Sequence, residues 1–157
     1  GEFVKTYHAP TASEKGLSFR FREEFFSVSH KNVLRGMHLQ KRPHAHTKIV
    51  YCVAGSILDV LVDLRPNEPS FLQTVSFDLI HKNRSVLWIP PGIAHGFLSL
   101  EDNSCVVYKT DCEHFSESDT GVRWDSIQFD WGVQNPIVSE RDMQLCDVRN
   151  FEAAIEE

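Results

Sequence analysis

The sequence lacks the features that mark disulfide-rich, zinc-binding and membrane proteins. Its four cysteines show no CxxC spacing (Cys52, Cys105, Cys112 and Cys146). Cys52 and Cys105 lie inside apolar runs, so we expect buried free thiols in a reducing compartment, which favours the cytoplasm. No apolar stretch reaches the roughly 20 residues that span a bilayer, and no signal-peptide core follows the first residues. We therefore expect no membrane partner.

The charge balance further limits the classes of molecule that we expect the protein to bind. Sixteen lysines and arginines stand against 22 aspartates and glutamates, and no long basic run occurs. Because binding to a nucleic-acid backbone requires clustered cations, we expect no nucleic-acid partner. A small phosphorylated molecule needs only a few local cations, which an acidic chain can supply. The length of 157 residues predicts a single domain over positions 1–157.

The middle of the chain is rich in short apolar segments separated by turn residues. Thr47–Val53, the turn Ala54-Gly55-Ser56 and Ile57–Leu64 together predict a hairpin. Short strands at even spacing are typical of an antiparallel sandwich or barrel. The further expected strands are Val33–Gln40, Phe71–Leu79, Ser85–Ile89, Ala94–Leu100 and Ser104–Thr110.

Helical signals are confined to the end of the chain. Ser139 is a predicted N-cap, with Asp142 at the third helical position. Asn150 is a predicted cap of a final short helix. The chain is thus expected to form one β domain with a short helical tail.

The segment Leu17–Ser29 interleaves phenylalanines with charged residues. Alternation in its first half predicts an edge strand. Because large aromatic residues on strands usually belong to the core, we expect a core position for Phe19, Phe21, Phe25 and Phe26. The alternative is that these rings stack on a nucleotide base while the neighbouring arginines hold its phosphates.

Two sets of residues compete for the histidines, and the first set would bind a metal. The pair His44 and His46, together with the later His95, resembles the motifs of metal-dependent cupins, in which histidines converge on a transition metal. Residues i and i+2 of a strand point to one face, which fits the pair. These motifs add a glutamate four or five residues past the pair, where this chain has Val50 and Tyr51. The pattern is incomplete, and we predict no metal site.

The second set would move a proton next to a carbonyl group. His38 lies near the end of one predicted strand, Lys48 begins the next, and Asp142 lies where the helical tail can fold back on His38. A carboxylate bonded to an imidazole fixes its tautomer and raises its basicity, as a general base requires. A lysine stabilises an enolate, and Tyr108 would return a proton to the opposite face. The spacing of these residues fits equally well a set of polar side chains that form hydrogen bonds within the wall of a barrel and have no catalytic role.

Five segments resemble the dTDP-4-dehydrorhamnose 3,5-epimerase family. They occur in the family's order and with similar spacing: Asn32–Gln40, Lys48–Arg65, Leu87–Leu100, Val106–Thr110 and Gly121–Asp142. The resemblance implies an all-β cupin-type jelly roll, a sandwich or barrel with short C-terminal helices. It also implies an isomerase that inverts C3, C5 or both in a nucleotide-linked 4-keto-6-deoxy sugar. Such an enzyme would act as a homodimer, without cofactor or metal, in deoxysugar and cell-surface polysaccharide biosynthesis.

The resemblance also implies a role for individual residues. His38 matches the family's catalytic base and Asp142 its paired carboxylate. Lys48 matches the lysine near the C4 oxygen, and Tyr108 matches the acid on the far side of the sugar. Arg35 matches the arginine that holds the nucleotide diphosphate, and His95 lines the cavity. The full set of expected substrate contacts is Arg35, Gln40, His95, Ser27, Lys15 and Lys109.

The N-terminal part departs from the family pattern. Only Ser13–Leu17 resembles the turn that reaches into the partner subunit, and Glu23–Ser27 replaces a polar segment that often reads Gln-Asp-Asn-His-Ser. The nucleotide (dTDP, CDP, GDP or UDP), the sugar and the inverted carbon are therefore left open. A metal-dependent cupin enzyme and a non-catalytic sugar-nucleotide binding module are the alternative hypotheses.

Overall fold

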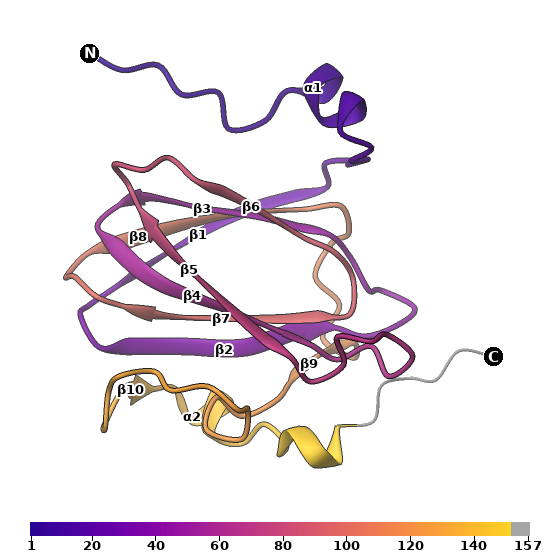
Figure 1. Ribbon diagram of the computed structural model, residues 1–157, viewed down its shortest axis with the longest axis vertical. Helices are drawn as coiled ribbons and strands as arrows, with labels where there is room; N and C mark the ends of the chain where they lie inside the picture. Colours follow the sequence, from indigo (N-terminus) through magenta and orange to yellow (C-terminus); the bar gives the residue numbers. More distant parts are fainter. Residues whose placement is uncertain (152–157) are drawn as a thin grey trace.

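Two β-sheets pack face to face in the computed structural model, which describes residues 1–151 (Figure 1). The first sheet has the order β1-β8-β3-β6, formed by Glu23–Ser29, Ser104–Thr110, Lys48–Ala54 and Val86–Ile89. The second has the order β10-β2-β7-β4-β5, formed by Ile137–Val138, Val33–Gln40, Ile93–Ser99, Ser56–Asp63 and Thr74–Ile80. Strand β9 (Asp119–Gly121) pairs with β2. The predicted all-β jelly-roll class is confirmed.

The two sheets differ in what covers their outer faces. The C-terminal segment packs against the outer face of the second sheet, where Val122, Ile127 and Trp131 join one core cluster (Figure 1). Strand β4 is consequently buried along most of its length. In the first sheet, residues of β8 alternate between buried and half-buried, as expected for a sheet with one face in the core. The second core cluster lies between the sheets and includes Tyr108.

The predicted strands are present, with ends that shift by a few residues. The shift is largest at Phe71–Leu79, where β5 begins only at Thr74. Leu72 has a positive φ of 62°, and its N–H donates to the carbonyl of Asp63 across the turn. Phe71 and Leu72 therefore lie in a turn, although their apolar side chains favoured a strand.

The predicted hairpin at Gly55 is wrong. Strand β3 pairs with β6 and β8, while β4 pairs with β5 and β7, so the turn carries the chain from one sheet to the other. Gly55 has a φ of +74°, and a Cβ there would lie 2.8 Å from the Cα of Ser104. A short glycine turn serves a corner between two sheets as well as a hairpin, and its sequence does not distinguish them.

The N-terminal segment differs from the sequence predictions for its edge strand and for its phenylalanines. The edge strand β1 occupies the second half of Leu17–Ser29 rather than the first. Phe21, Phe25 and Phe26 are 55%, 46% and 68% exposed, so their predicted core position is wrong. Helix α1 (Ala9–Glu14) was also not expected; its N-cap makes no side-chain capping bond, and the proline in its first turn is the signal that the sequence offered.

The C-terminal helices confirm the predicted cap. Helix α2 (Glu140–Met143) begins after Ser139, whose Oγ accepts the backbone N–H of Asp142 at 3.1 Å. A 3-10 helix, η1 (Val148–Asn150), follows. The helix predicted after Asn150 lies outside the described residues, and the single domain over 1–157 stays a prediction.

The cysteines and the helices are the structural features that relate to the predicted cytoplasmic location. All four cysteines are free; Cys52 is buried, whereas Cys105 is half-buried because it faces outward on β8. None of the helices within residues 1–151 is long and apolar enough to cross a membrane. The cytoplasmic location stays a prediction.

Candidate active site

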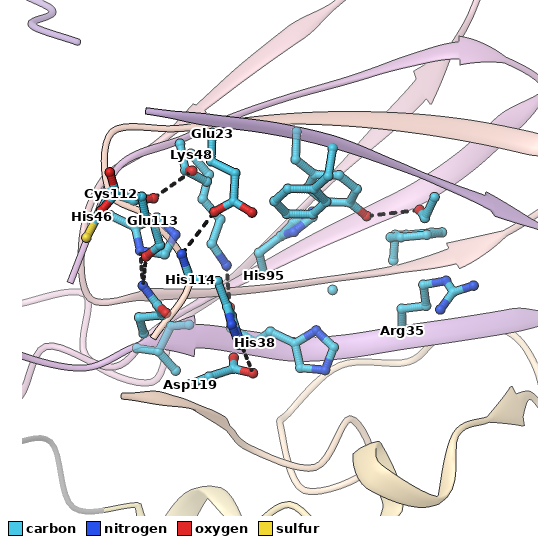
Figure 2. Close-up of a pocket in the computed structure, with 18 of the residues that line it drawn as sticks. Glu23, Arg35, His38, His46, Lys48, His95, Cys112, Glu113, His114 and Asp119 are labelled. Carbon is cyan, nitrogen blue, oxygen red and sulfur yellow. Dashed lines mark hydrogen bonds and ion pairs between the residues drawn. The ribbon is translucent and has the colours of Figure 1, made fainter. Parts of the chain in front are cut away.

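A cavity of about 280 Å³ opens between the two sheets (Figure 2). Its walls come from β1, β8 and β3 on one side and from β2 and β7 on the other, with the loop after β8 at one end. The predicted site residues that line it are Ser27, Arg35, His38, Gln40, Lys48, His95 and Tyr108.

His38 and Asp142 form a hydrogen-bonded pair across 104 residues of sequence. The Nε2 of His38 lies 2.7 Å from Oδ1 of Asp142, whose side chain is only 4% exposed. The second carboxylate oxygen accepts the backbone N–H of Gly36 at 3.0 Å. Because a carboxylate accepts hydrogen bonds, Nε2 carries the proton and Nδ1 of the neutral ring keeps its lone pair. The imidazole projects into the cavity (Figure 2).

The surroundings of Asp142 keep it ionised. Burial alone would raise the pKa of this carboxyl, but the hydrogen bonds from His38 and Gly36 hold the pKa below its ordinary value. A charged carboxylate beside the ring favours the imidazolium that forms when His38 takes a proton. The pair therefore has the geometry and charge of a general base.

Lys48 enters the cavity from the start of β3. Its Nζ donates to the backbone carbonyl of His38 at 3.0 Å, which places the ammonium group beside the proposed base. Burial lowers the pKa of Lys48 to about 8, and the carboxylates of Asp119 and Asp59 oppose that shift. A partly desolvated ammonium group interacts strongly with an oxygen that becomes negative.

Tyr108 lies on the first sheet, opposite His38, and its side chain is held from two sides. Its ring stacks on Phe25 with centroids 4.8 Å apart, and its hydroxyl lies 3.4 Å from Oγ of Ser27. Burial raises the pKa of this phenol above its ordinary value, despite the opposing hydrogen bond with Ser27. The hydroxyl thus stays protonated in neutral solution, as a proton donor must.

A second imidazole–carboxylate pair borders the cavity and includes a residue that the sequence did not reveal. The Nε2 of His95 lies 2.6 Å from Oδ2 of Asp59, which is fully buried. Burial raises the pKa of Asp59, although the neighbouring His95 opposes the shift. His95 is the register partner of His38 across β2 and β7, which brings both rings to one cavity. An acid in the otherwise apolar run Ile57–Val62 was the available signal for Asp59.

Arg35 and Gln40 have different surroundings. The Nε of Arg35 donates to Oγ of Ser29 at 3.1 Å, and the guanidinium group lies at one end of the cavity (Figure 2). The amide of Gln40 instead binds the loop after β8: its nitrogen donates to the carbonyl of Glu113 at 3.1 Å, and its oxygen accepts the N–H of Phe115 at 2.6 Å. Gln40 therefore shapes the cavity wall by holding that loop.

Two predicted substrate contacts do not lie at the cavity of this chain. Lys109 follows the inward-facing Tyr108 on β8, so strand alternation turns it outward, where its Nζ lies 3.5 Å from the carboxylate of Glu24. Lys15 follows helix α1 in the N-terminal segment and is exposed.

The histidines of the metal hypothesis are not brought together. His44 and His46 precede β3 in a loop, so the strand geometry expected for them is wrong. The ring of His44 stacks on Phe115 at 3.6 Å, and His95 is paired with Asp59. Within residues 1–151, no group of three or more histidine, cysteine or acidic side chains is arranged to hold a metal ion.

Comparisons with known proteins identify the family of the chain. A family model described as dTDP-4-dehydrorhamnose 3,5-epimerase matches residues 1–150. The dTDP-4-dehydrorhamnose 3,5-epimerase of Shigella flexneri is 39% identical over 146 residues, which cover 91% of this chain and 81% of that protein. The enzyme of the same name from Methanothermobacter thermautotrophicus is 39% identical over 147 residues, covering 90% and 79%.

Solved structures give the same result. The dTDP-4-dehydrorhamnose 3,5-epimerase of Bacillus anthracis, with TDP and PPi bound, has a TM-score of 0.89 and 35% identity and covers 91% of this chain and 83% of that one. The dTDP-6-deoxy-D-glucose-3,5-epimerase of Legionella pneumophila, in complex with dTDP-4-keto-L-rhamnose, has a TM-score of 0.90 and 32% identity, covering 96% and 82%. The chain therefore belongs to the dTDP-4-dehydrorhamnose 3,5-epimerase family and is an isomerase that epimerises nucleotide sugars.

Proposed function

We propose that this enzyme inverts C3 and C5 of a dTDP-linked 4-keto-6-deoxyhexose. The observation that carries the proposal is the His38–Asp142 pair at 2.7 Å, whose imidazole enters a cavity that also holds Lys48 and Tyr108. The dTDP-4-keto-L-rhamnose in the Legionella structure and the TDP in the Bacillus structure support the class of ligand.

The first step is removal of a proton from the carbon next to the ketone. Nδ1 of His38 takes the proton from C3, and Asp142 stabilises the imidazolium that results. The electron pair moves into the C3–C4 bond and onto the C4 oxygen, which becomes an enolate. The Lys48 ammonium stabilises that oxygen as its charge develops.

The second step returns a proton from the other face of the ring. Tyr108 reaches the cavity from the first sheet, whereas His38 belongs to the second, so the two groups approach the sugar from opposite sides. Tyr108 gives its proton to C3 as the enolate returns to the ketone. Solvent then returns a proton to the Tyr108 phenolate and takes one from the His38 imidazolium, and C5, which is also next to the ketone, follows the same route. Protons move but the oxidation state of the sugar does not change, so the steps consume no redox equivalent.

Arg35 is proposed to hold the diphosphate. Its guanidinium group provides several fixed N–H donors, and Ser29 orients it at one end of the cavity. Anchoring the phosphates there places the sugar ring alongside His38 and Lys48 (Figure 2).

The proposal predicts solvent exchange at both carbons next to the ketone. When dTDP-4-keto-6-deoxyglucose is incubated with the enzyme in deuterated water, proton NMR should show loss of the C3 and C5 signals as the 4-keto-rhamnose product forms. The variant His38→Asn keeps a similar shape but lacks the base, so its turnover should fall by at least ~1,000-fold. Unchanged sugar with wild-type enzyme would instead favour a binding module, and near-normal turnover by His38→Asn would refute the base.

The lowered pKa of Lys48 predicts a pH dependence. The ammonium is the active form, so turnover should fall as the pH rises through about 8, the pKa of Lys48. Tyr108 does not titrate in that range, because burial raises its pKa further above neutrality. Arginine keeps its charge throughout this pH range. A Lys48→Arg variant should therefore be slower at pH 7 yet lose the decline above pH 8; the same decline in both enzymes would contradict this role.

We also propose that the chain forms a homodimer through the outer face of the first sheet. That face carries exposed apolar side chains on three strands: Phe26, Val28, Val53 and Val86, which are 68%, 50%, 50% and 38% exposed. Large apolar patches on a soluble protein mark interaction sites, and a two-fold pair of identical faces is the commonest way to cover them. The rim pair of Glu24 with Lys109 adds charges of both signs, which suits a self-complementary contact.

The dimer proposal predicts that one charge on this face separates the subunits. Phe26→Glu should give a monomer in sedimentation velocity at micromolar concentration, because burying an unpaired carboxylate is costly. Phe71→Glu is the matched control, since Phe71 is 40% exposed in the turn before β5, away from this face. A wild-type monomer, or a Phe26→Glu dimer of unchanged affinity, would contradict the proposal.

A further inference from the structure

The inward face of β1 lies along the cavity, and most of its side chains support other groups there. Ser29 contacts Arg35, while Ser27 and Phe25 contact Tyr108. Each of these residues therefore supports a group with a proposed role. Glu23, the fourth inward residue of the strand, supports none of them, although it also lines the cavity.

One oxygen of the Glu23 carboxylate is fixed and the other is available. Oε2 accepts the backbone N–H of His114 at 2.9 Å, which fixes the position of the group. Oε1 accepts no hydrogen bond from the described residues, and the carboxylate projects into the cavity near Lys48 (Figure 2). A half-buried carboxylate with one tethered and one open oxygen is a preorganised acceptor.

The neighbouring acids differ from Glu23. Asp119 lies 2.5 Å from Nη2 of Arg141, and Glu113 lies 4.0 Å from Nη1 of Arg22, so both have an arginine partner. Glu23 forms no ion pair within residues 1–151. Within residues 1–151, Glu23 thus lines the cavity with a carboxylate that no lysine or arginine pairs with.

The two ends of the cavity differ in the charges that they carry. Arg35 lies at one end, whereas Glu23 and Lys48 lie at the other, with the imidazole of His38 between them (Figure 2). Phosphate groups would be repelled by Glu23, so the diphosphate belongs at Arg35. The sugar ring then extends past His38 toward Glu23, with the ring edge that carries its hydroxyl groups within reach of the carboxylate.

We propose that Glu23 is a specificity-determining residue whose open oxygen accepts a hydrogen bond from a ring hydroxyl at C2 or C3 of the hexose. This inference rests on the proposed epimerase function. The C4 oxygen is an acceptor and the C5 methyl group is apolar, which leaves these two hydroxyls as the donors on the ring. The hydrogen bond selects sugars that keep the hydroxyl and fixes the rotation of the ring above His38.

Deleting the hydroxyl and the carboxylate separately and together tests the contact. Glu23→Gln keeps the size of the side chain, and its carbonyl oxygen can still accept the His114 N–H, but it turns an NH2 donor toward the cavity. The probes are dTDP-4-keto-6-deoxyglucose and its 2-deoxy and 3-deoxy analogues, with deuterium exchange next to the ketone as the readout. For the wild-type enzyme, loss of the correct hydroxyl should lower kcat/KM by ~10–100-fold. For Glu23→Gln, the same deletion should cost less than about threefold.

Glu24→Gln is the matched control. Glu24 is the next residue on the same strand, but it faces outward and pairs with Lys109, so this variant should respond to both analogues like the wild type. Equal losses in wild type and Glu23→Gln with both analogues would overturn the role of Glu23 while leaving the epimerase function intact. Failure of the wild-type enzyme to epimerise the parent sugar would overturn the proposed function itself.

Discussion

The hydrogen bond between His38 and Asp142 is the contact around which the site is organised. It joins a strand of the second sheet to a four-residue helix, and the Ser139 cap fixes the carboxylate at the start of that helix. The N–H of Gly36 binds the other oxygen, and Gly36 has a φ of +121° with no room for a Cβ, which would lie 2.5 Å from the Cα of Gly96. The fold thus holds both partners of the pair independently of substrate.

Burial between the sheets gives the other groups their chemistry. The same loss of water lowers the pKa of Lys48, raises the pKa of Tyr108 and raises that of Asp59. One cavity therefore contains an ammonium that is poorly solvated, a phenol that keeps its proton and two imidazoles oriented by carboxylates. A keto sugar that enters it meets an environment already arranged for charge on the C4 oxygen, and little reorganisation is left to the reaction.

The sequence predicted the strands well and the pairing of strands poorly. Alternation and turn residues locate β2 and β8, but whether Gly55 turns a hairpin or a corner depends on the pairing of β3 with β8 and of β4 with β7, strands that are far away in sequence. His38 and Asp142 were recognisable because their segments resemble a known family, whereas the only signal for Asp59 was an acid in an apolar strand. The two phenylalanines of β1 were misjudged for different reasons: Phe26 faces outward from the sheet, and Phe25 faces inward but lines an open cavity, and the local pattern shows neither.

The most direct measurement of the central claim is the rate at which Asp142→Asn exchanges the C3 proton of the keto sugar for solvent deuterium. Asparagine keeps an oxygen that can accept the Gly36 N–H, so thermal unfolding should be close to that of the wild type. Because the neutral amide no longer stabilises the imidazolium, exchange should slow by at least ~100-fold at saturating substrate. Exchange at the wild-type rate by the folded variant would show that His38 does not depend on Asp142, and would contradict the account.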